Sequence, residues 1–394
     1  MRIYPATLAL LLAGAMTAAC TTSAASPDAI AAASPGPLPA SATPASTATP
    51  LPSATPTIPP TQTPSATPTV TPQPTPSPTP APRLIQLTEG GCCAQPAFSP
   101  DSQQVLFIDK PATAAPVGVY GVSLSEPLPA QPTLIEPVIG FRSPDRAVVA
   151  TMAGDMASFS NELTGESWQV DTGGNWPEFS PDGRRIAWVA TDREGPYDQR
   201  RSDIWLANLD GSNARRIFVL YGGGLAGWFP DSERLLLLGR NNPADEEQNL
   251  ISYHPGRDET TLLASHKRIR GIELSPGGSW VVFYLDFAED EPANRGVWLL
   301  ASDGASRRKL NVPGFGAYRW RNDNTLLFIP MRASAGESMQ LWAVDVTTDQ
   351  AAPLTDPDSL SFSISNGDWD VSPNGQTVIF VNSADQNIWA IQLP

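Results

Sequence analysis

The sequence predicts an all-β domain of repeated four-stranded sheets that follows a long proline-rich segment, and three observations lead to this prediction. The composition changes abruptly near residue 83, where proline and threonine repeats give way to short apolar runs separated by turns. One turn sequence returns about every 45 residues. An aromatic or branched residue returns with the same spacing. Seven such units of four short strands match the blades of a β-propeller, and a β-sandwich with coincidental turns is the alternative.

Residues 1–20 have the pattern of a secretory signal, because one positive charge at Arg2 precedes an apolar run and small residues follow. The run is shorter than the roughly 20 apolar residues of a membrane-spanning helix. Its last residues, TAAC ending at Cys20, resemble a bacterial lipobox, which implies a lipid-modified Cys20. An ordinary cleaved signal is the alternative. We therefore expect an extracytoplasmic protein, lipid-anchored to the cell membrane and displayed at the cell surface.

Residues 21–82 contain 18 prolines, no aromatic residue and one charged side chain, Asp28. Such a composition cannot bury a core, so we expect a disordered Pro/Thr/Ser-rich linker. Its repeated Ser-Ala-Thr-Pro units favour extended polyproline II, with a reach of at most about 190 Å. This segment is predicted to be a stalk between the anchor and a β-propeller at residues 83–394.

The charge of the chain lies in the predicted folded part. The net charge is −15 and the isoelectric point is about 4.5. Arg2 and Asp28 are the only charged residues before residue 83. An acidic surface repels phosphate, which excludes nucleic acid as a partner. Two histidines and three cysteines leave little for a metal centre or a disulfide framework, and we expect no metal and no cofactor.

The repeated turn joins the first two strands of each unit. Its seven copies begin at Phe98, Ser143, Phe179, Phe229, Leu274, Trp320 and Val371. Most contain Pro with Asp, Gly or Asn, the residues that connect antiparallel strands tightly. Apolar runs such as Val281–Leu285 follow most of them and predict strands buried on both faces.

The second repeated feature is an aromatic or branched residue in the third strand. Its seven members are Tyr120, Phe159, Trp205, Ile251, Trp298, Trp342 and Trp389. Together with turns such as Phe179-Ser180-Pro181-Asp182-Gly183, they resemble the WD40-like repeats of the TolB-type β-propeller over residues 84–394. The resemblance implies a propeller and protein partners in the cell envelope. Blade 2 departs most from the pattern, since Arg146 replaces the turn glycine.

The two ends of the domain are predicted to meet. The segment Ile388–Pro394 is predicted to be a third strand with no fourth strand after it, and Arg83–Thr88 resembles a fourth strand. The N-terminal strand should therefore complete the last blade and remove exposed strand edges. We expect a monomer with seven blades, within a range of six to eight.

Long polar loops between second and third strands are the first candidate binding site. They contain Asp245, Glu246, Glu247, Glu289, Asp290, Glu291, Arg200 and Arg201. In propellers these loops share one face with the connections between blades, and loops on a rigid scaffold often carry binding sites. Charge runs are as often merely solvated, and both interpretations stay open.

The inner strands, which line the central channel, are the second candidate site. One position in them holds Glu178, Glu273, Arg319 and Asp370 in different blades. A mixed ring of this kind is suited to a cation or a small polar ligand. A water-filled channel with internal ion pairs explains it equally well and is preferred.

Cys92 and Cys93 are adjacent and precede the first inner strand. Outside the cytoplasm they are expected to be either a vicinal disulfide or two free thiols. A catalytic thiol is disfavoured, since no histidine lies near them in sequence. The chain has no Gly-X-Ser-X-Gly elbow, so we assign no catalytic residue. The expected function is a protein-binding or scaffolding module of the cell envelope, and the alternative is a glycan-binding or glycan-cleaving propeller that uses the channel mouth.

Overall fold

The computed structural model describes residues 81–394 except residues 92–93, 126, 193, 287–290 and 332–336. Several predictions fall outside this part of the chain. They concern the signal and anchor at Cys20, the proline-rich segment up to residue 80, the pair Cys92 and Cys93, and the acidic residues Glu289 and Asp290.

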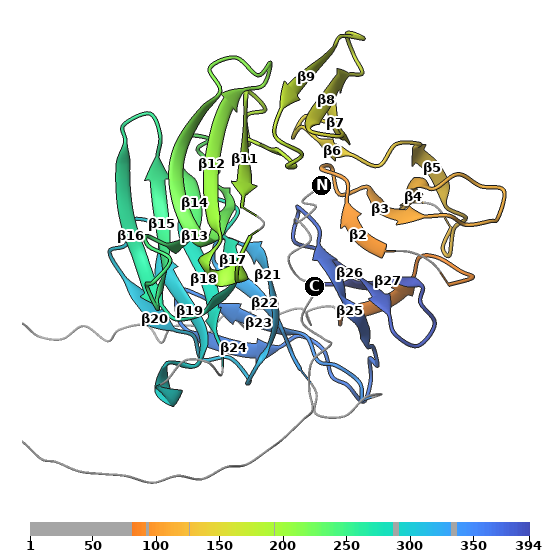
Figure 1. The fold of residues 1–394 in the computed structure, drawn as a ribbon. Coiled ribbons are helices and arrows are strands. Elements are labelled where there is room, and N and C mark those ends of the chain that lie inside the picture. Colours follow the sequence, from red (N-terminus) through yellow and green to blue (C-terminus); the bar gives the residue numbers. More distant parts are fainter. Residues whose placement is uncertain (1–80, 92–93, 126, 193, 287–290, 332–336) are drawn as a thin grey trace, which may run out of the picture. The chain divides into compact units, whose positions relative to one another are not determined.

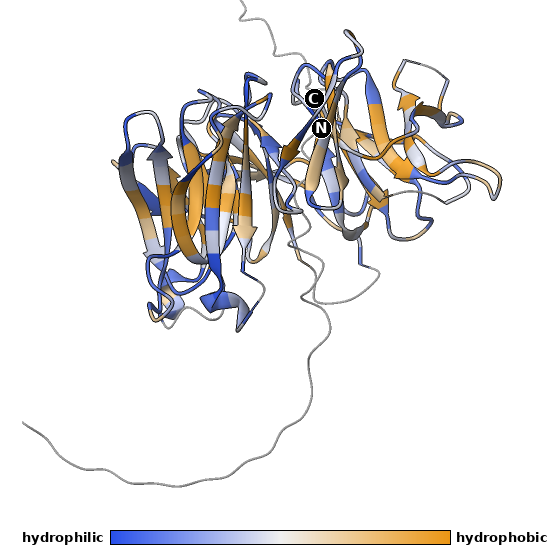
Figure 2. Ribbon diagram, turned by 45° about the horizontal axis from the view of Figure 1, so that its top comes forward, coloured by the Kyte–Doolittle hydropathy of each residue, from blue (hydrophilic) through white to orange (hydrophobic). Residues whose placement is uncertain are grey.

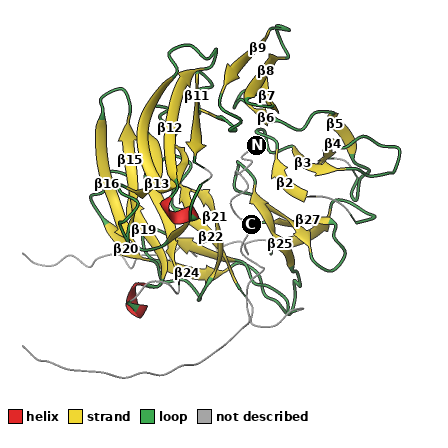
Figure 3. Cartoon of the chain, in the orientation of Figure 1, coloured by secondary structure: helices red, strands yellow, loops and turns green. Residues whose placement is uncertain are grey.

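Strands form nearly all of the regular structure in the described residues, and the prediction of an all-β chain is confirmed (Figure 3). The two helical turns, η1 (Tyr197–Gln199) and η2 (Pro292–Asn294), are three residues long each. Both lie in loops between a second and a third strand, at the places where the sequence predicts long connections.

The strands form six hydrogen-bonded sheets. Strands β2 to β5 are Ala94–Phe98, Gln104–Asp109, Gly118–Ser123 and Thr133–Glu136. Strands β6 to β9 are Phe141–Arg142, Val148–Ala153, Met156–Asn161 and Ser167–Asp171. The seven-stranded sheet, β10 to β16, contains Glu178–Phe179, Arg185–Thr191, Arg201–Asn208, Arg215–Trp228, Leu235–Arg240, Gln248–His254 and Glu259–His266.

The remaining sheets contain the C-terminal strands and β1. Strands β17 to β20 are Ile269–Leu274, Trp280–Leu285, Gly296–Ala301 and Arg307–Lys309. Strands β21 to β24 are Gly316–Asn322, Thr325–Pro330, Trp342–Asp345 and Gln350–Pro353. The last sheet has the order β1-β27-β26-β25, with β25 at Ile364–Val371, β26 at Thr377–Asn382, β27 at Ile388–Gln392 and β1 at Arg83–Gln86. The sheets follow one another around a common centre, which is the arrangement of a β-propeller (Figure 1).

The two repeated features of the sequence meet in the middle of every repeat. The third-strand residue lies opposite a buried residue of the second strand. The seven pairs are Phe107 with Tyr120, Ala150 with Phe159, Trp188 with Trp205, Leu237 with Ile251, Phe283 with Trp298, Phe328 with Trp342, and Phe380 with Trp389. Four of the second-strand residues are phenylalanines without exposed surface. The recurring spacing therefore reflects one cross-strand pair that lies at the centre of each repeat.

The turns between first and second strands are closed by a buried serine. Ser99, Ser143 and Ser180 donate to the aspartate two residues later at 2.5–2.6 Å. A residue with positive φ follows, and this is Gly183 in the third repeat but Arg146, at φ 61°, in the second. The substitution noticed in the sequence thus places a side chain in a conformation that favours glycine.

Six clusters of buried apolar side chains hold neighbouring repeats together. Figure 2 shows the apolar residues along the strands and hydrophilic residues in many of the turns. In the described residues, no such cluster joins the sheet β2–β5 to the sheet β6–β9. That pair of sheets therefore differs from the others in how it is stabilised.

The N-terminal strand forms the outer strand of the C-terminal sheet. β1 pairs with β27 in antiparallel register from Arg83–Gln392 to Gln86–Trp389. Two further contacts fix the segment, since Thr88 Oγ1 accepts from Ile388 N at 2.9 Å and Asn387 Oδ1 accepts from Gly91 N at 3.0 Å. This pairing agrees with the strand order expected from the sequence.

Candidate functional site

Glu273 and Arg319 form an ion pair between neighbouring inner strands. Glu273 lies in β17 and Arg319 in β21, and Arg319 Nη1 donates to Glu273 Oε1 at 2.5 Å. The Glu273 side chain is 9% exposed and that of Arg319 28%. A carboxylate this deeply buried needs a charged partner, and Arg319 supplies it. The pair connects two neighbouring sheets and is an internal ion pair of the kind that the preferred interpretation of these residues includes.

Arg319 also contacts the next inner strand, β25. Its guanidinium carbon lies 5.4 Å from the centre of the Trp369 ring. Burial raises the pKa of Asp370, and hydrogen bonding and the charge of Arg319 oppose this rise. Burial also raises the pKa of Asp368, which the sequence analysis missed because it lies outside the repeated position. The structure thus relates three of the four predicted channel residues, Glu273, Arg319 and Asp370.

Glu178 in β10 stands apart from this group. Burial raises the pKa of its carboxyl from 4.5 to about 7, and burial is the sole cause. Within the described residues, its carboxyl has no hydrogen bond or ion pair, although its surface is not fully buried. A carboxyl in such surroundings exchanges a proton near neutral pH and is free to bind a donor.

The predicted acidic loop at residues 245–247 lies between β14 and β15, and each of its carboxylates has a local partner. The contacts are Asn242 N to Asp245 Oδ2 at 2.9 Å, Lys267 Nζ to Glu246 Oε2 at 3.0 Å, and Ser265 Oγ to Glu247 Oε2 at 2.7 Å. All three side chains remain exposed or partly exposed. The loop therefore offers a surface of paired charges to solvent.

The other described loop charges are also engaged near their own positions. Arg200 Nε donates to Gly195 O at 3.1 Å, and Arg201 pairs with Asp203 at 3.0 Å. Glu291 accepts from Asn294 at 3.2 Å. These contacts support the loop conformations, and they do not by themselves select between a binding surface and solvated loops.

Exposed apolar side chains are the feature of the loop face that sequence reasoning missed. The loop face is here the end of the sheets that carries the connections between second and third strands and those between successive sheets. Seven of the eleven large exposed hydrophobic residues in the described chain lie in these loops. They are Val117, Val138, Ile139, Trp176, Tyr197, Phe315 and Met331. Their positions do not repeat, so the repeat pattern gives no signal for them.

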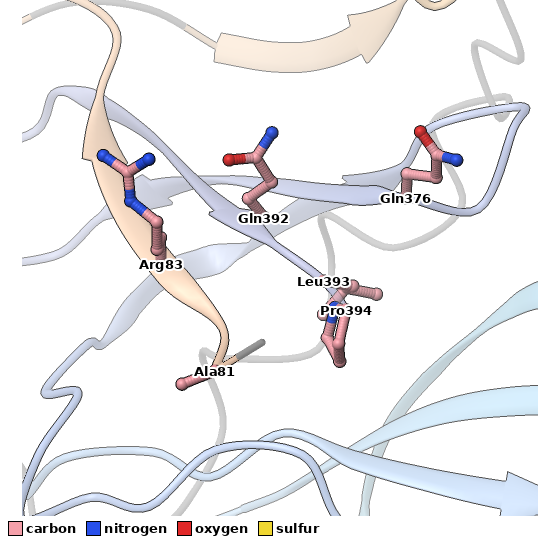
Figure 4. Close-up of a pocket in the computed structure, with 6 residues that line it drawn as sticks. All are labelled: Ala81, Arg83, Gln376, Gln392, Leu393 and Pro394. Atoms are coloured by element: carbon pink, nitrogen blue, oxygen red, sulfur yellow. The ribbon is translucent and has the colours of Figure 1, made fainter. Parts of the chain in front are cut away.

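Two hollows flank the start of β1. The first has a volume of about 260 Å³ and is lined by Ala81, Arg83, Gln376, Gln392, Leu393 and Pro394. Figure 4 shows the Arg83 and Gln392 side chains projecting from these neighbouring strands. The second is lined by residues including Leu84 and Asp356. Neither includes a channel residue or a predicted loop charge, so the hollows mark no candidate site of the sequence.

The described residues contain no group of three or more His, Cys, Asp or Glu placed to hold a metal ion. In the same part of the chain, no helix has the length and apolar character needed to cross a membrane.

Comparisons with known proteins identify the fold. No protein-family model matches the chain. The chain is 26% identical to the uncharacterized peptidase YuxL of Bacillus subtilis (strain 168) in a match that covers 39% of this chain and 30% of the length of that relative. Oligogalacturonate lyase from Vibrio parahaemolyticus is similar in structure, with a TM-score of 0.53 and 12% identity, covering 79% of this chain and 91% of that chain.

A putative TolB from Agrobacterium tumefaciens is also among the similar structures, with a TM-score of 0.39 and 17% identity, covering 67% of this chain and 92% of that chain. The interpretation of the repeats as a β-propeller is confirmed for the fold by the arrangement of the sheets. At these identities the comparisons define the class of protein, a β-propeller, and no activity.

Proposed function

We propose that this chain is a lipid-anchored extracytoplasmic β-propeller that binds another protein of the cell envelope and acts as a scaffold. The lipobox-like residues before Cys20 and the proline-rich segment support the anchor and the stalk. The resemblance to TolB-type repeats supports a protein as the ligand. Nucleic acid is disfavoured by the net charge of −15.

We also propose seven blades and a ring closed by the N-terminal strand. The 14-residue strand β13 runs through the seven-stranded sheet, and it serves as the outer strand of one blade and the inner strand of the next. Counting it in both blades gives seven from six sheets. The pairing of β1 with β27 and the hydrogen bond from Asn374 N to Ser102 Oγ support contact between the last blade and the first.

One observation carries the binding function, namely the concentration of exposed apolar side chains on the loop face. Large exposed apolar residues lose their contact with water when a partner covers them, which favours association. The paired loop charges around them provide the polar rim that protein interfaces usually have.

The test is affinity capture from solubilised envelope extract, using the chain from residue 81 onward and variants on opposite faces. A loop-face variant carries Trp176→Ser with charge reversal at Asp245, Glu246 and Glu247. The control carries Leu163→Ser, which removes an 83% exposed side chain from the opposite end of the sheets. A protein kept by the wild type and the control, and lost by the loop-face variant, would support the function. Equal retention by both variants would contradict it.

A second candidate function is binding or cleavage of a glycan at the channel mouth. The specific observation in its favour is Glu178, whose carboxyl has no partner in the described residues and a pKa of about 7. Glu178→Gln and Glu273→Gln should then abolish retention or hydrolysis on a glycan array, while the loop-face variant should leave both unchanged. Absence of any glycan signal from the wild type would remove this candidate.

A further inference from the structure

The outer strand of the first blade, β5, and the loops next to it expose five apolar side chains. Leu134 is 41% exposed and Ile135 39%. Val138 and Ile139, in the connection that follows, are 49% and 40% exposed, and Val117 before β4 is 51% exposed. A side chain at Gly118 would clash with Leu134, so residues 117–118 and β5 are in contact. Five of the eleven large exposed hydrophobic residues therefore belong to one blade and its loops, with Leu134 and Ile135 on opposite faces of β5.

The edge of β5 carries no charged side chain that would discourage pairing with another strand. β5 has a single neighbour, β4, so half of its backbone groups point outward. By contrast, the outer strand β20 consists of Arg307, Arg308 and Lys309. Pro132 and Pro137 flank β5 and confine the free backbone groups to the four residues between them. The one charge in β5, Glu136, is 4% exposed and turned inward.

The contact between this blade and the next is also unusual. The face of the second blade that looks away from its apolar cluster carries Thr151, Ser158, Ser160 and Gln169. In place of an apolar cluster, Glu136 forms ion pairs with Arg142, at 2.8 Å, and with Arg146. Glu136 Oε2 and Arg146 Nη1 are buried and have no hydrogen-bond partner among the described residues. The blade that carries β5 is consequently held less completely on this side than the other blades.

We propose that β5 and the connection at residues 137–140 bind an extended apolar segment of a partner protein, which adds to the sheet β2–β5 as a further strand. Outward backbone groups of an edge strand are satisfied by another strand, and the alternating side chains of that strand supply specificity. The five exposed side chains are uncharged, and three of them, Val117, Val138 and Ile139, lie on the loop face.

The segment comes from another protein and not from a second copy of this chain. A net charge of −15 on each copy opposes self-association, and an uncharged edge is suited to a partner that brings only apolar contacts and backbone hydrogen bonds. The proposal rests on the proposed protein-binding function and narrows it to one blade and to one kind of partner segment.

The test measures binding of the whole chain to a panel of synthetic peptides of about eight residues, in which β-branched residues alternate with Thr or Lys. Versions of these peptides that contain proline cannot pair as strands and serve as negative controls. The double variant Leu134→Lys/Ile135→Lys introduces the charges that guard natural edges. Leu262→Lys is the matched control, because Leu262 is a 58% exposed leucine on another outer strand, β16. Thermal melting verifies that both variants fold.

We expect the wild type and Leu262→Lys to bind the alternating peptides and the β5 variant to bind at least about tenfold more weakly. Equal binding by the β5 variant, equal loss in the control, or no binding by the wild type would overturn the proposal. So would a dimer in sedimentation velocity that the β5 variant abolishes, because the occupant would then be a second copy. If the β5 variant still captures the envelope protein that the loop-face variant loses, the proposed function stands and this inference fails.

Discussion

At the scale of single residues, the most informative group is the carboxyl of Glu178. Its pKa is about 7 in the folded protein because burial disfavours the anion, and it is 4.5 for an unburied glutamate. Between these two values the unfolded chain ionises this carboxyl while the folded protein keeps it protonated. Its contribution to stability therefore falls as the pH rises from 4.5 through 7.

Glu178→Gln should remove that loss. Above about pH 7.5 the free energy of unfolding of the variant should exceed that of the wild type by at most about 3 kcal/mol. Near pH 4 the variant and the wild type should have equal free energies of unfolding. Urea unfolding at several pH values measures this. Glu194→Gln, at an exposed loop position, is the control and should leave the profile unchanged. A wild-type profile without a decline between pH 5 and 7.5 would contradict the assignment.

Arg146 presents two opposing effects at one residue. Glycine at this position would relieve the left-handed conformation, by roughly 1 kcal/mol. It would also remove one of two arginines that pair with the buried Glu136, and an uncompensated buried charge costs about 3 kcal/mol or more. Arg146→Gly should therefore destabilise the protein by about 1–2 kcal/mol in urea unfolding. Ser102→Gly, at the same turn position and φ, lacks the ion pair; it relieves the same backbone conformation but removes the hydrogen bond that Ser102 Oγ accepts from Asn374 N, so these two effects should offset each other to within about 1 kcal/mol.

At the scale of elements, the sequence predicts the strands well because each repeat has the same physical requirements. A buried second strand needs a continuous apolar run, and its tight turn needs a residue tolerant of positive φ. Phe283 and Trp298, for example, could be placed because they recur in register with the other repeats. The polar face formed by Ser158 and Ser160 was not predicted, since its alternation has meaning only when the neighbouring blade is known.

The candidate site was predicted less well than the strands. The repeated position led to Glu273 and Arg319, but only the structure shows that they neutralise each other. The repeated position could not predict the exposed residues of β5 or the exposed Trp176. The exposure of these residues depends on which other parts of the protein cover them and not on the local sequence.

β1 offers a test at the level of one element. It adds backbone pairs to β27, and the segment after it contributes Leu87, fully buried in the cluster between the last and first blades. Deleting residues 83–90 should lower the melting temperature of the whole domain by more than about 5 °C, since a few kcal/mol are lost at one place in a domain that unfolds cooperatively. Leu87→Ala alone should cost about 2–4 kcal/mol. An unchanged melting temperature after the deletion would show that β1 is dispensable.

At the scale of the whole molecule, the proposed function depends on holding the propeller at a membrane through a segment that carries no core of its own. One acyl chain gives reversible binding, whereas a diacylated cysteine gives stable anchoring, at about 0.8 kcal/mol for each buried methylene group.

The expressed full-length chain should therefore partition into the detergent phase of a Triton X-114 extract. Cys20→Ser should move it to the aqueous phase without changing the melting temperature of the propeller. Cys92→Ser/Cys93→Ser is the matched control and should stay with the detergent, because these cysteines are more than 70 residues away from the predicted lipobox in the sequence. Detergent partitioning of Cys20→Ser would require another membrane attachment, and aqueous partitioning of the wild type would leave the scaffold without its proposed anchor.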